Sequence, residues 1–500
     1  MRLSTSALPL LLAALALPAG AQERNVACSG GMAGVYPCAN VDLMAHMPLS
    51  TFAVTGSGAP SDDNDIWGWT DPATGREYAL VGNSNGTSFV DVTNPGAPVF
   101  LGKLPTATDE SPWRDIKVYN NHAFIVSEAG GHGMQVFNLT RLRNVTSPPV
   151  LFTADAHYTG VSNSHNIAIN EATGFAYLVG TNTCAGGLHM VNIQNPLTPT
   201  AAGCFSADGY THDTQCVLYD GPDAQFTGHE VCFSSNEDTV TITDVTNKAA
   251  PALIAGGRAS YPSPGYTHQG WLTEDHRYFI VDDEGDETNG TVATTRKIVF
   301  DVSDLNAPSV AFEYFGPLLT IDHNLYVRGR YAYQSNYTSG LRILDLAGID
   351  SNTLTEVASF DTYNQSNAVS FNGQWSNYPF FASGTVVAND IDNGLFVLRP
   401  TNLAVAAEPD PATGFALTAP APNPTTGVAR VELTLTRTQS VRAEAFDALG
   451  RRVAVVFDGP VAAGAPAALT FDATALPAGP YLLRITGEAF VASRRVTVAH

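Results

Sequence analysis

The chain carries few basic side chains. Its 500 residues include 25 Lys and Arg against 47 Asp and Glu, which gives a formal net charge of −22. A surface of this sign repels phosphate backbones and anionic lipid headgroups. We therefore expect neither a nucleic acid nor a membrane surface among the partners, and we interpret the acidic excess as a device for solubility.

Long apolar runs are scarce as well. After the first 22 residues no segment is apolar for 18 residues, which is about the length that a membrane-spanning helix needs. The first residues, MRLSTSALPLLLAALALPAGAQ, combine one Arg, an apolar run and a small-residue Ala-Gly-Ala stretch. This pattern is typical of a secretory signal peptide, here over residues 1–21. The sequence thus predicts a secreted protein, located outside the cell or on the outer-membrane surface.

Cysteine is also rare, and none of it forms a Cys-x-x-Cys motif. In an exported chain, disulfide bonds are favoured over metal thiolates. Six cysteines permit fifteen pairings, among which the sequence alone does not choose. Closeness along the chain favours the pairs Cys28–Cys38, Cys184–Cys204 and Cys216–Cys232. We interpret all six as structural residues.

Several catalytic motifs are missing. The sequence has no His-Glu-x-x-His motif, no P-loop and no dinucleotide-binding fingerprint. Paired carboxylates occur throughout so acidic a chain, so they do not indicate glycoside hydrolysis. The sequence therefore assigns no catalytic residue, and whether the protein is an enzyme stays open.

Repetition is the strongest positive signal. A phrase similar to Asp-Val-Thr-Asn-Pro-x-x-Pro recurs, as in VDVTNPGAP from Val90, VNIQNPLTP from Val191 and FDVSDLNAP from Phe300. Apolar runs stand before each copy, and the first run of each unit begins at a polar pair. These pairs, 47 to 56 residues apart, are Asn64-Asp65, Arg114-Asp115, His165-Asn166, His212-Asp213, His268-Gln269, His323-Asn324 and Ser376-Asn377.

Four short strands in each unit of about fifty residues are typical of a β-propeller blade. We predict an all-β fold with a seven-bladed β-propeller over residues 45–400, preceded by an N-terminal segment, residues 22–44, that holds Cys28 and Cys38. The seventh unit lacks its fourth strand, and the stretch MPLSTFAV, residues 47–54, resembles the missing one. The N-terminal residues are therefore expected to close the last blade, which hides the sheet edges.

These repeats resemble a known family. The stretch LVGNSNGTSFVDVTNPGAP is similar to the LVIVD repeat, and most of residues 28–400, including GMAGVYPCANVDLMAHMPL, resembles the choice-of-anchor B family of secreted bacterial proteins. The resemblance implies a propeller-like body joined to one of several C-terminal anchors. It implies no particular reaction.

The C-terminal part carries a resemblance of its own. After a linker, residues 401–418, the motifs Pro-Asn-Pro, Asp-Ala-Leu-Gly-Arg and Leu-Pro-Ala-Gly and the final Arg-Val-Thr-Val resemble the C-terminal sorting domain of the type IX secretion system. This implies that residues 419–500 direct passage across the outer membrane, followed by attachment or release at the surface. Alternating strands with Gly and Pro turns also predict a small β-sandwich. A generic fibronectin-like adhesion module is the alternative.

Four consecutive units place a histidine at the same point, His165, His212, His268 and His323. In a propeller these positions gather at one mouth of the central channel, so the imidazoles could share a divalent transition metal such as zinc or copper. Glu128 and Asp282 are expected beside them, as ligands or as groups that orient the rings. The alternative is that these polar residues only tie neighbouring loops together.

The run DDEGDETNG, which begins at Asp282, concentrates acidic side chains near the same mouth. It offers oxygen ligands for calcium but lacks the EF-hand spacing. A solvated acidic loop is the favoured interpretation, and a calcium site is the alternative.

Two functions remain. The first is a secreted, surface-displayed and monomeric binding module for an extracellular protein or small ligand, with a candidate metal at the channel mouth. The second is a metal-dependent redox or hydrolytic enzyme that uses the same histidines.

Overall fold

The computed structural model describes residues 24–401, 403, 414–418, 420–447, 451–487 and 490–499. The predicted signal peptide and most of the predicted linker lie outside this part of the chain. Helix in the described residues is confined to the short 3-10 turns η1 (Leu49–Phe52), η2 (Leu139–Asn144), η3 (Cys184–Gly186) and η4 (Ile349–Ser351). No helix in these ranges is long and apolar enough to cross a membrane. The predicted all-β class is confirmed.

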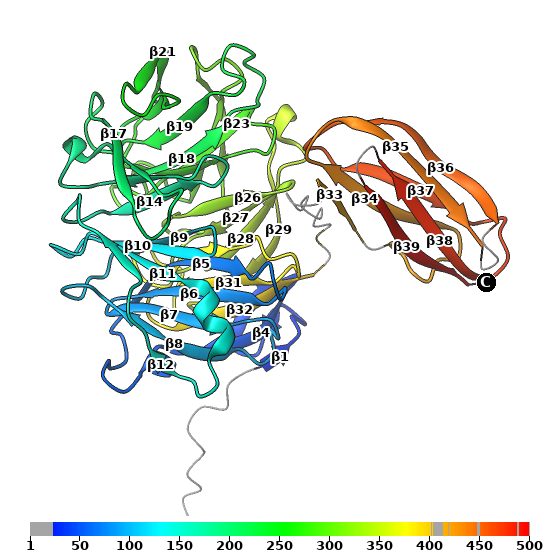
Figure 1. Ribbon diagram of the computed structural model, residues 1–500, viewed down its shortest axis with the longest axis horizontal. Helices are drawn as coiled ribbons and strands as arrows, with labels where there is room; N and C mark the ends of the chain where they lie inside the picture. The colour runs from blue at the N-terminus through cyan, green and yellow to red at the C-terminus, as the bar shows by residue number, and fades with distance from the viewer. Residues whose placement is uncertain are drawn as a thin grey trace, which may run out of the picture.

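Seven small antiparallel sheets lie between residues 24 and 400 (Figure 1). The first contains β5 (Asp63–Thr70), β6 (Glu77–Asn83), β7 (Gly86–Asp91) and β8 (Val99–Pro105), with β12 (Val150–Leu151) added in parallel to β8. The second contains β9 (Arg114–Tyr119), β10 (His122–Ser127), β11 (Met134–Asn138) and β13 (Ala156–Tyr158). The third contains β14 (Asn166–Asn170), β15 (Phe175–Val179), β16 (Leu188–Asn192) and β17 (Thr200–Phe205). The fourth contains β18 (Asp213–Leu218), β19 (Glu230–Ser235), β20 (Val240–Asp244) and β21 (Ala252–Ala259).

The remaining three sheets follow the same plan. The fifth contains β22 (Thr267–Leu272), β23 (Tyr278–Asp283), β24 (Arg296–Asp301) and β25 (Ser309–Phe315). The sixth contains β26 (Leu325–Arg328), β27 (Tyr331–Ser335), β28 (Leu341–Asp345) and β29 (Thr355–Phe360), extended by β3 (Tyr36–Ala39) and β2 (Met32–Ala33). The seventh contains β30 (Gln374–Tyr378), β31 (Val386–Asp390), β32 (Gly394–Pro400) and β4 (Val41–Met47), extended by β1 (Arg24–Val26).

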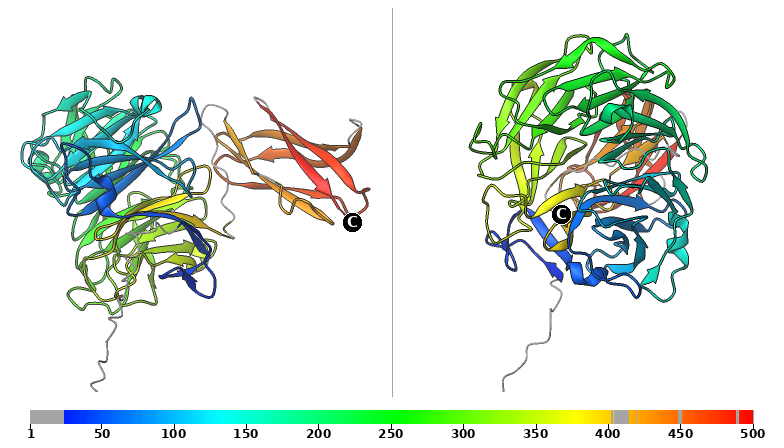
Figure 2. Two further views of the ribbon diagram at one scale, coloured as in Figure 1. Left: turned by 90° about the horizontal axis from the view of Figure 1, so that it is seen from below. Right: turned by 90° about the vertical axis from the view of Figure 1, so that its left-hand side faces the viewer.

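The first strands of these sheets form a closed cycle. Each contacts the next in the order β5, β9, β14, β18, β22, β26 and β30, and β30 contacts β5 again. Figure 2 (right) shows the same cycle as a ring in which the blue N-terminal and yellow sheets are neighbours. This propeller-like arrangement directs the starts of all the first strands to one end of a central channel.

The repeated Asp-Val-Thr-Asn-Pro phrase has a local structural cause. Its first residue ends the third strand of a sheet and accepts a hydrogen bond from the main chain two residues on, as Asp91 does from Thr93 (3.0 Å) and Asp301 from Ser303 (2.9 Å). Such side-chain turns are the reason that Asp is favoured at strand ends. The pairing of third and fourth strands shifts register within the same phrase, between Phe89 and Val90 in the first sheet. The phrase therefore encodes a β-bulge and a turn rather than a reactive group.

An N-terminal strand completes the seventh sheet, as expected, but this strand is β4 rather than residues 47–54. β4 pairs with β32 through Pro400↔Val41 to Leu395↔Met47, and this pairing shifts register between Val397 and Leu398, as the third and fourth strands of five other sheets do. The side chains of β4 alternate between buried and half-buried positions, which suits an outer strand whose two faces differ in burial. Residues 47–54 instead form a turn and η1. The predicted segment boundary at residue 44 falls inside β4.

The hydrophobic core lies between neighbouring sheets. Phe233 of β19 and Phe279 of β23, from the fourth and fifth sheets, are fully buried with ring centroids 5.6 Å apart. Each such side chain contributes about 2–3 kcal/mol of burial free energy. Where the seventh sheet meets the first, the ring of Tyr378 occupies the space that a Cβ atom would need at Gly68. Close packing of this kind holds the ring of sheets rigid around its channel.

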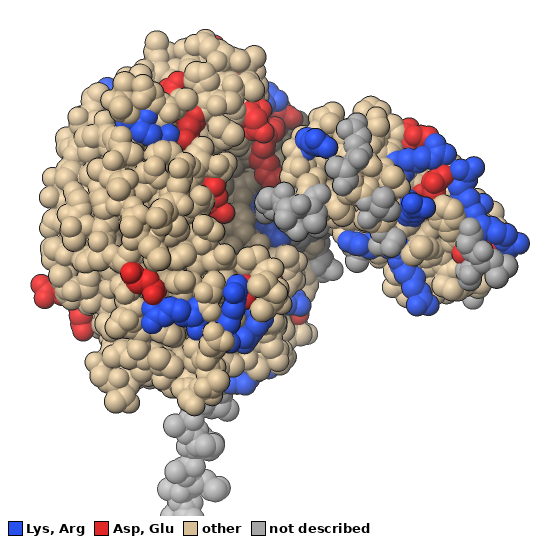
Figure 3. Space-filling view, in the orientation of Figure 1, with Lys and Arg blue, Asp and Glu red and all other residues tan. Residues whose placement is uncertain are grey.

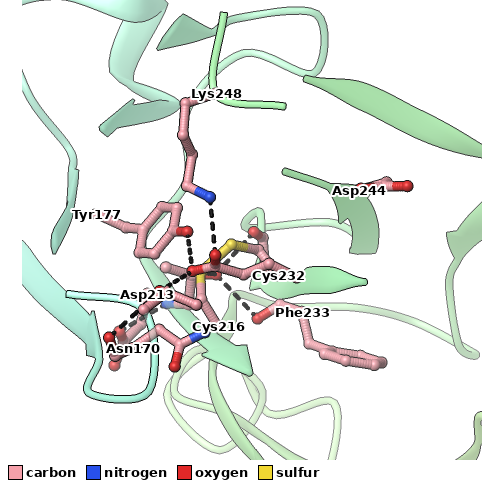
Figure 4. The surroundings of a disulfide bond; sticks show 12 residues. Asn170, Tyr177, Asp213, Cys216, Cys232, Phe233, Asp244 and Lys248 are labelled. Carbon is pink, nitrogen blue, oxygen red and sulfur yellow. Dashed lines mark hydrogen bonds and ion pairs between the residues drawn. A yellow bond between two sulfur atoms is a disulfide. The ribbon is translucent and has the colours of Figure 1, made fainter. Parts of the chain in front are cut away.

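Three disulfide bonds join Cys28 to Cys38, Cys184 to Cys204 and Cys216 to Cys232, which confirms the predicted pairs. Cys216 and Cys232 are direct partners in the β18–β19 ladder. Figure 4 shows this bond between the side chains of Tyr177 and Lys248 on one side and Phe233 on the other. The bond links β18, the first strand of the fourth sheet, covalently to β19.

Two further sheets form the C-terminal part. One contains β33 (Phe415–Leu417), β34 (Val428–Leu435) and β37 (Ala467–Asp472), and the other contains β36 (Arg452–Val461), β35 (Gln439–Phe446), β38 (Gly479–Thr486) and β39 (Val491–Val498). Val431, Phe471 and Ile485 belong to one buried cluster that both sheets share. In the view of Figure 3, Lys and Arg side chains are spread over this part.

Candidate metal centre

One end of the channel opens into a cavity of about 470 Å³. Its lining comes from the starts of the first strands and from the loops beside them. All four predicted histidines line it, together with Glu284, Tyr337 and Trp375. Trp113 and Phe371 form part of the rim and are 42% and 54% exposed, respectively.

The four histidines form a continuous row. The ring centroids of His165 and His212 lie 4.3 Å apart, those of His212 and His268 lie 4.2 Å apart, and those of His268 and His323 lie 4.4 Å apart. The rings are tilted against one another by 39° to 54°. His212, His268 and His323 are at most 5% exposed. The structure thus brings together all four residues that the repeat pattern singled out.

Every ring in the row is held through its Nδ1 atom. The Nδ1 of His165 lies 2.6 Å from Glu128 Oε1, and that of His268 lies 2.9 Å from Asp282 Oδ1. The other two rings donate to main-chain carbonyl oxygens, as described below. Glu128 and Asp282 therefore lie beside the rings as expected, and their roles toward a metal stay predictions.

His212 Nδ1 lies 2.9 Å from the carbonyl oxygen of His268, and His323 Nδ1 lies 2.5 Å from that of Trp375. A carbonyl oxygen only accepts, so Nδ1 carries the proton in both rings. Nε2 then holds the lone pair of the neutral ring. This is the tautomer that metal-binding histidines adopt when a second group orients them.

Burial keeps these rings neutral. It lowers the pKa of His268 to about 4 and holds the pKa values of His212 and His323 well below the usual range. The neighbouring imidazoles act in the same direction, because two positive rings at this distance repel each other. At neutral pH the imidazoles of these three residues are consequently uncharged, and neutral imidazoles are ligands for zinc, copper, iron and nickel.

Glu284 completes the group. Its Oε2 lies 3.8 Å from Nε2 of His268, its Oε1 lies 3.6 Å from Nε2 of His323, and donor atoms of the three residues all lie within 4.8 Å of one another. Ligands of a tetrahedral zinc ion, at about 2.0–2.1 Å, are about 3.4 Å apart. These three side chains could therefore hold one metal ion after small movements.

The sequence interpretation did not count Glu284 as a ligand of this ion, although it follows the second strand of the fifth unit directly. Tyr337 was also missed, and its hydroxyl donates to Glu284 Oε1 at 2.5 Å. In the seventh unit the residue that lines the cavity is Trp375, one position before the predicted Ser376. A register shift between Gln374 and Ser376 moves the pattern by one residue.

Arg114, which precedes Asp115 in the second unit, turns away from the cavity. Its Nε donates to the carbonyl oxygen of Asn83 at 3.0 Å, and its Nη1 lies 3.0 Å from Nε2 of His132. Burial and the neighbouring guanidinium lower the pKa of His132 to about 4. Trp113 takes the place beside the histidines instead.

The acidic loop is not solvated, so the interpretation favoured from its charge is wrong. Asp282, Asp283 and Asp286 are fully buried, and Glu287 is 6% exposed. Arg296 Nε donates to Asp286 at 2.7 Å, and Asp283 accepts hydrogen bonds from Tyr261 and from the main chain of Gly265 and Tyr266. These carboxylates support the loop that carries Glu284, and calcium binding remains a prediction.

The hairpin between β6 and β7 carries a sequence pattern that also occurs in hydrolases. Gly82 to Gly86 spells Gly-x-Ser-x-Gly, the pattern of a hydrolase nucleophile elbow. That elbow requires a turn from a strand into a helix, whereas these residues form the hairpin between β6 and β7. Ser84 hydrogen-bonds Ser61 there. The pattern marks a strand turn and no nucleophile.

The LVIVD repeat family matches residues 76–106, which span β6, β7 and β8. No curated protein matches the chain by sequence. Among solved structures, a protein from Lactobacillus plantarum is 12% identical, with 82% of this chain and 99% of that chain covered and a TM-score of 0.42. The extracellular domain of BT4673 from B. thetaiotaomicron is 13% identical, with 92% of this chain and 59% of that chain covered and a TM-score of 0.44.

The C-terminal WD40 domain of Sif2 is 9% identical, with 76% and 96% of the two chains covered and a TM-score of 0.41. Likenesses at these values assign neither a family nor a function. The chain therefore contains an LVIVD repeat within a propeller-like set of sheets.

Proposed function

We propose that this protein is a secreted, seven-bladed β-propeller that binds an extracellular ligand at a divalent transition-metal centre in the mouth of its channel. His268, His323 and Glu284 would hold the ion, and His212 and His165 would stand beside it. The observation that carries the proposal is the common orientation of the imidazoles, because every Nδ1 is engaged and the Nε2 atoms of His268 and His323 lie near Glu284.

Zinc suits this set of ligands best, since two imidazoles and one carboxylate are a usual zinc set, and copper is the second choice. Three protein ligands leave a position for a ligand atom from the cavity. The ion would supply Lewis acidity there. The chain's own residues orient the imidazoles, and Tyr337 hydrogen-bonds the carboxylate that faces them.

The cellular setting belongs to the same proposal. The three disulfide bonds support an oxidising compartment. The resemblance to choice-of-anchor B proteins and to type IX sorting domains supports export, with residues 419–500 as a removable β-sandwich that leads to surface attachment or release. The mature protein would act as a monomer on an extracellular protein or small ligand.

Metal analysis tests the centre directly. The chain from residue 22 onward is purified without chelator, and its metal content is measured by inductively coupled plasma mass spectrometry. We expect about one equivalent of metal, which His268→Ala and Glu284→Gln abolish. The control is His229→Ala, which changes a 42%-exposed histidine that pairs with Asp244 at 2.7 Å. Metal-free wild type, or metal that persists in both variants, would overturn the proposal.

The alternative is a metal-dependent redox or hydrolytic enzyme. The open cavity and the predicted vacant coordination position favour it, because catalytic zinc sites keep such a position. Both functions require an accessible coordination position, which cobalt-substituted protein tests, whereas turnover of a redox dye or an activated ester by the metal-loaded chain would single out the enzyme. A visible spectrum that changes with azide indicates an accessible metal position, whereas an unresponsive spectrum indicates a closed structural ion.

A further inference from the structure

The channel has a second cavity, of about 410 Å³, away from the histidines. Strand β18 begins next to His212, at the metal centre, and ends at Leu218, which lines this second cavity. Strand β5 likewise begins at Asp63, in the first lining, and continues to Trp67, in the second. The two cavities therefore lie toward opposite ends of one channel and share no lining residue.

Three aromatic side chains form one wall of the second cavity. The ring of Tyr326 lies 5.6 Å from that of Trp67 and 5.0 Å from that of Trp271, both at 74°. Trp67 and Tyr326 are 9% and 2% exposed, and Trp271 is half-buried. Edge-to-face packing fixes the three rings as a rigid apolar surface. This wall can cover the body of a small organic ligand.

The wall already holds one ammonium group. Lys117 Nζ lies 4.6 Å from the ring centroid of Trp67 and 2.6 Å from Asp115 Oδ1. Tryptophan is the best aromatic partner for a cation, because its ring face is electron-rich. An aromatic ring and a carboxylate of the channel thus already surround one positive charge, that of Lys117.

The carboxylates in this part of the channel outnumber the cations. Asp65, Asp115 and Asp213 all act electrostatically on the single ammonium of Lys117. Asp115 is engaged, because Oδ1 contacts Lys117 and Oδ2 accepts from the main chain of Ile167 at 2.9 Å. Asp213 lines the cavity, and its Oδ1 accepts a bond from the adjacent main chain of Thr214.

The rim continues the acidic character. Glu171, Asp220 and Glu274 line the outer part of the cavity together with His276, which pairs with Asp220. The field of such a rim attracts cations and repels anions. Figure 4 shows Asp213, the first residue of β18, and Asn170 side by side near the disulfide.

We propose that this second cavity binds a small organic cation, an amine or quaternary ammonium with an apolar body. Its charge would lie toward Asp213, and its body would lie against Trp67 and Trp271. The site is independent of the metal centre, so chelators do not affect it. The acidic rim disfavours an anionic ligand, and a neutral ligand would form no ion pair with Asp213.

Calorimetric titration of the full chain from residue 22 with choline tests the proposal, with 3,3-dimethylbutan-1-ol as the neutral probe of the same shape. Burial raises the pKa of Asp213 to about 8, so the titrations are run at pH 9, where the carboxylate is ionised. We expect choline to bind at least about tenfold more tightly than the alcohol, as a desolvated cation on tryptophan does. Added chelator leaves this difference unchanged.

Two variants locate the site. Trp271→Leu and Asp213→Asn should each weaken choline binding about tenfold or more. Trp113→Leu, at the other end of the channel, is the matched control and should leave it unchanged. Circular dichroism of each variant verifies the fold.

Three outcomes would overturn the inference. Equal binding of choline and the alcohol would mean that the cavity recognises only apolar shape. Binding of glucose in place of choline would assign the wall to a sugar. No binding of any of the three probes would mean that the cavity is not a ligand site. None of these results bears on the metal content, so the two proposals fail separately.

Discussion

The Nδ1 atom of His212 lies 2.9 Å from the main-chain oxygen of His268, the next histidine of the row. The main chain at the start of the fifth sheet thus orients the imidazole at the start of the fourth sheet. His323 repeats the arrangement with Trp375, the equivalent residue of the seventh sheet. The row is therefore a connected structure, in which the position of each ring depends on the strand beside it.

Asp282 should control the metal affinity without being a ligand. Its Oδ1 lies 2.9 Å from Nδ1 of His268. Asp282→Asn replaces the carboxyl group of that partner with an amide, and we expect affinity to fall about 10–100-fold, as is typical for groups that orient a metal-binding histidine. Competition with a chromophoric chelator measures the change. Asp301→Asn, in a distant turn of the same sheet, is the control, and equal affinity of the two variants would contradict the orienting role.

The closure of the ring by β4 can be tested with substitutions at two aliphatic residues, Leu43 and Val54. Leu43 of β4 is fully buried, whereas Val54 of the segment first expected to close the ring is half-buried. Leu43→Ala should lower the free energy of unfolding by about 2–5 kcal/mol, and Val54→Ala by less than about 1 kcal/mol. Urea denaturation followed by tryptophan fluorescence measures both. If Val54→Ala lowered the free energy of unfolding more than Leu43→Ala, residues 47–54 rather than β4 would close the ring.

The Cys216–Cys232 bond should stabilise the fourth sheet substantially. The two cysteines are 16 residues apart in sequence and face each other across two strands. Replacing both with Ser should cost about 3 kcal/mol, because the unfolded chain regains the freedom that the bond removes. Thermal denaturation of oxidised wild type and variant measures the difference. A variant as stable as wild type would show that the strand pairing alone suffices.

Asp390 should make stability fall as the pH rises. Burial raises the pKa of this fully buried carboxyl to about 7, above the ordinary value of 3.8. The folded state therefore binds the proton more tightly than the unfolded state, and stability is lost as the pH rises from about 4 to about 7. The penalty at neutral pH is on the order of a few kcal/mol.

Asp390→Asn removes this titration. We expect the variant to match wild type in chemical denaturation near pH 4 and to exceed it above pH 7. Asp392→Asn, two residues on and not buried, provides the comparison at equal change of charge. Parallel pH profiles for wild type and Asp390→Asn would contradict the raised pKa.

Most of the fold was predictable because it consists of repeated units whose strands and turns depend on local sequence. Alternating strands and the Asx turn after the third strand of six sheets depend on a few neighbouring residues and recur at a spacing near fifty, so each leaves a mark in the sequence. The disulfide pairs were predictable for the same reason, since each closes a short loop. The choice between β4 and residues 47–54 was not, because it depends on pairing with β32, some 350 residues away.

The candidate site, like the fold, was predictable from the sequence only in part. Histidine at His165, His212, His268 and His323 was visible as a series, and the sequence by itself determined that these rings belong to equivalent strand starts. Only the tertiary structure decided that Glu284 and Tyr337 join them, that Trp375 replaces Ser376, and that the acidic loop is buried. Strand register and burial are set by contacts between distant sheets, and a one-residue shift in a strand turns a side chain to the other face.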